Sequence, residues 1–171
     1  MLIRCTKKLL SELKVKPTNE DPPKDPFWSW HANMFYIDRR KCVLITNDIT
    51  LFTLFIPALK KPDFQKFDLI FGQHLFENLM HEGIAQNQIE ILLSECNKIQ
   101  YDKTNNRSVL GSMNDQRFLV EYFIQSEGGL AKTNIFELNR RLNRNIFSAI
   151  DLKYPIKMLI RQLDSQNQTL H

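Results

Sequence analysis

The sequence has few cysteines, no long hydrophobic run and no apolar leader, and each absence excludes a class of protein. Its three cysteines lie far apart and are odd in number, so we expect reduced, buried thiols rather than a disulfide framework. The longest apolar stretch, residues 51–59, is interrupted by Pro57 and is far shorter than the roughly 20 residues of a membrane span. Residues 1–16 are basic but lack the apolar core of a secretory signal. We therefore expect a cytoplasmic protein that does not enter a membrane.

The composition is that of an ordinary globular domain. Hydrophobic residues make up 43% and charged residues 25% of the 171-residue chain, which argues against disorder. A folded chain of this length buries roughly 70% of the surface that it exposes when unfolded, so it needs no disulfide or metal to fold. We expect no cofactor. We also expect one domain over residues 1–163, followed by a polar tail over residues 164–171.

Residue patterns predict three strands in the first third of the chain. Every second side chain is apolar across residues 28–36, which is the period of a strand. A polar tip at residues 38–41 leads to a second strand at 42–46. A turn at residues 47–48 then leads to a third strand at 50–56. Such short connections predict an antiparallel meander.

Hydrophobic residues at helical spacing predict several helices around this sheet. Pro17 ends the first helix, Gly83 follows the longest and Pro155 opens the last. The expected elements outside the meander are strands at 2–5 and 99–104, helices at 7–13, 64–82, 89–96 and 108–125, and two helices that begin near residues 134 and 155. The predicted fold is therefore one α+β domain, an antiparallel sheet packed with several helices.

The charge balance is mildly basic. Lysine and arginine outnumber aspartate and glutamate by 23 to 19, a net charge of +4, and the basic residues gather in residues 1–16 and 132–161. Such a surface permits nucleic acid or another polyanion as a partner, although two solvated helix faces would give the same pattern. The residues that we expect to bind an anion are Arg39, Arg40, Arg107, Ser108, Arg140, Arg141 and Arg144.

His31 is the candidate for acid–base chemistry. It lies on the strand face opposite the tryptophans, and two carboxylates, Asp38 and Asp48, lie at neighbouring turns. A histidine paired with Asp48 or Asp38, and assisted by Arg107, is the kind of group that an enzyme of phosphoryl or nucleotide chemistry uses. The alternative is a hydrogen-bonded structural histidine.

Residues 103–115 have the composition of an anion-binding helix start. Arg107 and Ser108 open a predicted helix, where free backbone N–H groups and the helix dipole favour an anion. The glycine, lysine and serine order of a Walker loop is missing. The alternative is that Ser108 only caps the helix and that Arg107 ties the loop to an acidic neighbour.

Residues 133–144 have some features of the first helix in a helix-turn-helix unit. Arg140, Arg141 and Arg144 form a basic face that suits phosphate contacts. The segment at residues 145–154 is too long to be the tight turn of that motif, so we do not expect a helix-turn-helix unit.

An aromatic surface for single-stranded nucleic acid is a further interpretation. It would combine the basic tip residues 39–41 with Trp28, Trp30, Phe35 and Tyr36. Aromatic residues on strands belong more often to the core, and we expect that here.

One predicted helix carries potential metal ligands. His74, Glu77 and His81 lie on one side of the helix at residues 64–82. Two helical turns separate the histidines, which is too far for both to chelate one ion. We therefore expect no metal site.

Several blocks of the sequence together resemble a known family. The blocks are Trp28-Ser-Trp-His-Ala-Asn33, Asp38-Arg-Arg-Lys41, Asn106-Arg-Ser-Val-Leu-Gly-Ser-Met-Asn-Asp115 and Arg141-Leu-Asn-Arg144. In order and spacing they are similar to a bacterial family of small proteins of unknown function, over nearly the whole chain. The resemblance implies a bacterial, single-domain, cytoplasmic protein. It implies no activity, substrate or catalytic residue.

Three functions remain open at this point. The leading hypothesis is a non-catalytic module that binds an anionic ligand, including nucleic acid. The second is a regulatory protein that binds another protein and no small ligand. The third is a small enzyme that uses His31 with Asp48 or Asp38. Periodicity does not show which of these side chains meet in space.

Overall fold

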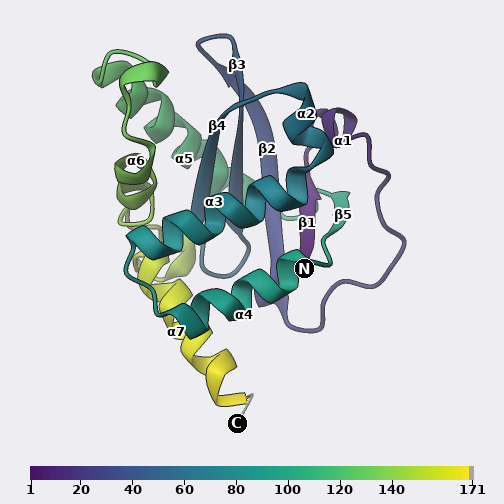
Figure 1. Ribbon diagram of the computed structural model, residues 1–171. Coiled ribbons are helices and arrows are strands. Elements are labelled where there is room, and N and C mark those ends of the chain that lie inside the picture. Colours follow the sequence, from purple (N-terminus) through teal and green to yellow (C-terminus); the bar gives the residue numbers. More distant parts are fainter. Residues whose placement is uncertain (170–171) are drawn as a thin grey trace.

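The computed structural model describes residues 1–169, which fold around a five-stranded mixed sheet with the strand order β4-β3-β2-β1-β5 (Figure 1). The strands are β1 (Leu2–Cys5), β2 (Ser29–Ile37), β3 (Arg40–Asn47), β4 (Thr53–Leu59) and β5 (Gln100–Lys103). The predicted antiparallel meander is present as β2, β3 and β4. The prediction of a purely antiparallel sheet is wrong, because β1 pairs in parallel with both β2 and β5. The chain reaches β2 from β1 through a long crossover that contains α1, and it reaches β5 from β4 through α2, α3 and α4, so each of these strands can enter the sheet parallel to β1.

The α+β class is confirmed, and the helices cover both faces of the sheet. They are α1 (Lys7–Leu13), α2 (Lys61–Gln65), α3 (Phe67–His81), α4 (Gln86–Cys96), α5 (Arg107–Ser126), α6 (Ile135–Leu142) and α7 (Pro155–Thr169), with 3₁₀ turns η1 (Pro26–Trp28), η2 (Leu130–Lys132) and η3 (Ser148–Ile150). The helix predicted over residues 64–82 is two helices, α2 and α3, which meet at Lys66. Within the described residues, no helix is long and apolar enough to cross a membrane.

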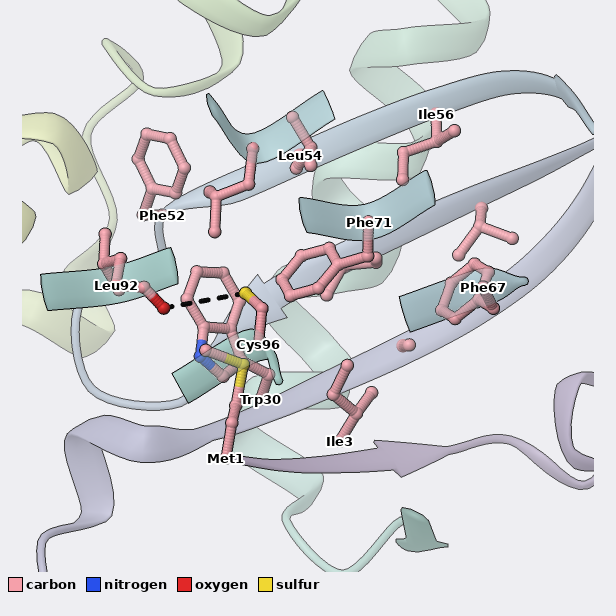
Figure 2. Close-up of a cluster of buried hydrophobic side chains, with 14 of the residues drawn as sticks. Met1, Ile3, Trp30, Phe52, Leu54, Ile56, Phe67, Phe71, Leu92 and Cys96 are labelled. Carbon is pink, nitrogen blue, oxygen red and sulfur yellow. Dashed lines mark hydrogen bonds between the residues drawn. The ribbon is translucent and has the colours of Figure 1, made fainter. Parts of the chain in front are cut away.

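The larger hydrophobic core lies on the sheet face covered by α1, α2, α3, α4 and α7. Trp30 occupies its centre and is fully buried, with the rings of Phe52 and Phe71 edge-on to it at centroid distances of 6.5 and 5.7 Å. Figure 2 shows this packing, and also the Cys96 thiol, which donates to the Leu92 carbonyl. Phe35 points to the opposite face, into the core under α5 and α6. Trp30 and Phe35 therefore belong to cores, as expected, whereas the same expectation is wrong for Tyr36, which is exposed on β2.

The outer edge of β4 is closed by two asparagines on and after α6. The side-chain oxygen of Asn139 accepts the Phe55 N–H at 2.8 Å, and its amide donates to the Phe55 carbonyl. One helical turn later, Asn143 makes the same two bonds with Thr53, at 2.7 and 2.8 Å. The two amides thus take the place of a neighbouring strand. An open edge would otherwise expose unpaired backbone groups to other chains.

The polar C-terminal residues continue the last helix. α7 extends to Thr169, so the predicted tail, residues 164–171, is helical as far as that residue. Asp164 accepts a hydrogen bond from Gln88, and Gln166 donates one to Asp25. Residues 170–171 lie outside the described part of the chain.

Replacing Asn143 by alanine should destabilise the protein. The change leaves the buried N–H and C=O of Thr53 without partners, and each such group costs about 1–3 kcal/mol. We expect the free energy of unfolding in urea to fall by about 3 kcal/mol. Asn145→Ala is the matched control, because the Asn145 side chain donates to the Arg141 carbonyl at the exposed end of α6, and its loss should cost less than about 0.5 kcal/mol. Equal losses for the two variants would contradict this role.

Stability should decline at alkaline pH because a thiol is buried. Burial raises the pKa of Cys96 from 9.0 to about 12. The unfolded chain can therefore release this proton near pH 9, whereas the folded chain retains it. The contribution is fully present below about pH 8 and is lost as the pH rises from 9 toward 12, with a loss of about 1.4 kcal/mol between pH 8 and 10. Urea unfolding at pH 8 and at pH 10 should show this fall in the free energy of unfolding, and Cys96→Ala should make the fall smaller.

Candidate functional site

A row of buried polar side chains crosses the sheet beneath α5. The strand register places Arg4 of β1 beside His31 of β2, His31 beside Thr46 of β3, and Thr46 beside Thr53 of β4. All four residues are buried. Because side chains alternate along a strand, they share the face that carries the smaller hydrophobic core. Polar groups in such a position must be paired within the protein.

Asp48 connects two members of this row. It lies in the loop after β3, and its Oδ2 accepts from the Arg4 guanidinium at 3.0 Å while its Oδ1 lies 2.7 Å from His31 Nδ1. The Arg4 and Asp48 side chains are 10% and 9% exposed, and that of His31 is not exposed at all. A buried carboxylate thus holds one cation and one imidazole in fixed positions.

Both ring nitrogens of His31 have partners. The backbone N–H of Asn105, just before α5, donates to Nε2 at 3.4 Å. Nε2 therefore acts as an acceptor, and Nδ1 carries the proton that bonds to Asp48. A general base needs a free nitrogen that faces a substrate. Here the imidazole joins β2, the β3–β4 loop and the start of α5.

The structure separates the two carboxylates that were candidates for His31. Asp48 contacts the imidazole, whereas Asp38 lies at the β2–β3 turn and accepts the Leu130 N–H at 2.8 Å. Sequence reasoning missed Arg4 as a member of the site. Its signal is a single charged residue inside an apolar strand, which indicates a buried ion pair.

The other half of the row carries no titratable group. Gln116 of α5 accepts hydrogen bonds from Thr46 at 3.1 Å and from Thr53 at 2.6 Å, and it donates to the Leu51 carbonyl at 3.2 Å. All three of these side chains are fully buried. This network fixes α5 on the sheet and offers no group for acid–base chemistry.

Two of the predicted anion-binding arginines are already paired with carboxylates. Arg144 makes a bidentate contact with Glu82 at 2.8 and 2.6 Å, which raises the pKa of its guanidinium above the usual value. Arg141 pairs with Glu137 at 3.2 Å and with Glu127 at 3.5 Å. The basic face of α6 is therefore largely neutralised by acidic residues of this chain. Residues 143–154 separate α6 from α7, so the two helices lack a tight helix-turn-helix connection.

The remaining anion candidates do not gather at one place. Arg39 and Arg40 are exposed at the β2–β3 turn, and Arg140 is exposed on α6. Arg107 and Ser108 form the first turn of α5. The cap of this helix is Asn106, not Ser108. The Asn106 side chain accepts the N–H groups of Ser108 and Val109 at 3.0 and 3.2 Å.

Basic residues do gather where the parallel strands β1 and β5 end. The register pairs Cys5 with Lys103, so both strands end at one edge of the sheet. β1 continues into α1, which begins with Lys7 and Lys8, and β5 continues through a short loop into α5, which begins with Arg107. We call Lys7, Lys8, Lys103 and Arg107 the basic edge. All four are exposed, and none of them forms a salt bridge within the described residues 1–169.

The potential metal ligands of α3 do not form a cluster. Burial lowers the pKa of His74, while His81 stacks on Phe136 at a centroid distance of 3.9 Å. Across residues 1–169, no three histidine, cysteine or acidic side chains converge on a position that could hold a metal ion.

Comparison with family models identifies the relatives of this chain. The model for Domain of unknown function (DUF6933) matches residues 2–158. The chain belongs to this family. The DUF6933 match runs from β1 into α7 and so includes the Arg4–Asp48–His31 cluster and the basic edge. No curated protein and no solved structure matches the chain. The bacterial origin implied by the sequence blocks stays a prediction.

Replacing Asp48 by asparagine should destabilise the fold strongly. The amide leaves the buried Arg4 charge without a counter-ion, and breaking such a pair costs about 3–5 kcal/mol. Urea unfolding should show a loss of that order. Asp151→Asn is the control, because that carboxylate is 90% exposed and its loss should have little effect. The double variant Arg4→Met/Asp48→Asn should regain part of the loss. No difference between Asp48→Asn and the native chain would contradict the assignment.

Proposed function

We propose that this protein is a non-catalytic binding module for a phosphate-bearing ligand, which it holds at the basic edge. The observation that carries the proposal is the arrangement of β1 and β5. They are adjacent parallel strands, yet α1 packs on one face of the sheet and α5 on the other. In open sheets with parallel strands, the crevice at the carboxyl ends of such a pair is where ligands bind.

The charge at this edge favours an anion. Lys7, Lys103 and Arg107 are exposed cations without a salt bridge in the described chain, in contrast to Arg141 and Arg144. Lysine binds phosphate as a point charge, and arginine can bind it with two parallel hydrogen bonds. The basic edge is therefore better suited to an external anion than the arginines of α6 are.

An aromatic side chain extends the surface. The ammonium of Lys8 lies 4.5 Å from the centroid of the Tyr36 ring, and Tyr36 is 48% exposed. Cations beside an exposed ring are typical of surfaces that bind single-stranded nucleic acid, in which bases stack and phosphates meet the charges. This makes a single-stranded oligonucleotide the natural first probe.

Binding without catalysis agrees better with the buried cluster than an enzymatic role does. Both nitrogens of His31 are occupied, and burial raises the pKa of Cys5, so neither group offers a ready base or nucleophile. The Arg4–Asp48–His31 cluster instead holds the β3–β4 loop and the start of α5, on which Arg107 lies. The cluster therefore has a structural role, because it positions the helix start that carries Arg107.

Binding of a short fluorescein-labelled single-stranded oligonucleotide tests the proposal by fluorescence polarisation. The affinity should fall as salt rises, with a slope of about −0.7 per phosphate contacted on a double-logarithmic plot. Lys103→Glu and Arg107→Glu should each weaken binding several-fold and reduce the slope by about 0.7. Free nucleotide and inorganic phosphate as competitors distinguish a polymer from a small phosphate ligand.

Arg161→Glu is the matched control. It makes the same change in net charge at an exposed position on α7, away from the basic edge (Figure 1). Its affinity should equal that of the native chain. If Arg161→Glu weakens binding as much as Arg107→Glu, or if binding does not respond to salt, the proposed site is wrong.

A further inference from the structure

A groove of about 660 Å³ runs between α3 and α4 on the outer surface of the molecule. The two helices form an antiparallel pair that covers the larger core, on the opposite side of the sheet from α5 (Figure 1). Leu93 and Cys96 of α4 line the groove, and Leu69 and Phe76 of α3 stand along it. None of these residues belongs to the basic edge.

The groove exposes large apolar side chains to solvent. Leu69 is 67% exposed and Phe76 is 43% exposed, and the two lie two helical turns apart on one side of α3. Met80, one turn further along the same helix, is 52% exposed. Leu69 and Phe76 line the same groove, and exposed apolar residues grouped in this way are typical of surfaces that bind another molecule.

The rim of the groove is acidic on both sides. Its only ionisable side chains besides the Cys96 thiol are Asp68 of α3 and Glu90 of α4. Asp68 accepts a hydrogen bond from Tyr101, and Glu90 accepts one from Gln86, so both carboxylates are held by neutral partners. An occupant with apolar residues toward the groove and basic residues along its flanks would complement this charge pattern.

We propose that the groove binds an amphipathic helix of another protein, with apolar anchors on one face and lysine or arginine beside them. The lining runs over residues 68–76 and 90–97, which is about two helical turns or roughly 12 Å. A helix presents anchors at positions i, i+3 or i+4, and i+7 over that length, and this is how helices dock in apolar grooves. The walls are helices whose backbone groups are paired internally, so they offer no edge to which a strand could add.

Two synthetic helical peptides test this inference, one built from leucine and lysine and one with glutamate in place of lysine. In fluorescence polarisation with the full chain, the leucine–lysine peptide should bind at least tenfold more tightly. Leu69→Ser and Phe76→Ser should each weaken it at least tenfold. Phe118→Ser is the matched control, because Phe118 is 68% exposed on α5 and should not affect binding.

Charge reversal gives a second measurement. Glu90→Lys should weaken binding of the leucine–lysine peptide about tenfold and strengthen binding of the leucine–glutamate peptide. Asp151→Lys, at an exposed carboxylate away from the groove, should change the binding of neither peptide.

Equal binding of both peptides, or an equal loss of binding in Phe118→Ser, would overturn the inference. So would dimerisation of the native chain in analytical ultracentrifugation that Leu69→Ser abolishes, because the occupant would then be a second copy. Lys103→Glu should leave peptide binding unchanged, which separates this test from that of the basic edge.

Discussion

The structure depends on pairing the polar groups that the sequence places under α5. Asp48 is the central member, because its carboxylate holds Arg4 of β1 and His31 of β2 at once. His31 in turn accepts the backbone N–H of Asn105, which fixes the point at which the chain enters α5. A buried arginine or carboxylate left alone would cost several kcal/mol, so strand, loop and helix must come together as a unit. The positions of β1 and of the start of α5 both follow from this requirement.

Local sequence patterns predicted those strands and helices that depend mainly on residues close together in the chain. Alternation predicted β2 and placed His31 on the face opposite Trp30, and apolar stretches between short turns predicted β3 and β4. The parallel pairing of β1 with β5 escaped prediction, because it joins residues almost a hundred positions apart. Asn139 and Asn143 looked like ordinary polar residues of an amphipathic helix. Their role on the β4 edge exists only once α6 lies beside that strand.

The same reasoning explains why the residues predicted to bind an anion lie at separate places in the structure. The sequence shows how many charged residues there are, whereas anion binding depends on cationic side chains that no neighbouring carboxylate neutralises. Glu82 lies far from Arg144 in sequence, yet it pairs with both of its terminal nitrogens. Conversely, Lys7 and Lys103 are far apart in the chain and come to one edge of the sheet through the pairing of Cys5 with Lys103. Clusters along the chain were therefore a poor guide to clusters in space.

The two faces of the sheet leave different surfaces for binding. The larger core is built mainly from apolar side chains of the sheet and the helices that cover it, and α3 and α4 also carry exposed apolar residues on their outer sides. The opposite face is held by a polar network in which Gln116 joins β3 and β4 to α5, and in which both ring nitrogens of His31 are occupied. Binding residues are commonly found on loops and helix ends that a rigid scaffold positions. Both proposals accordingly place the ligand on such surfaces, at the rim of the sheet and in the outer helical groove, rather than at the buried histidine.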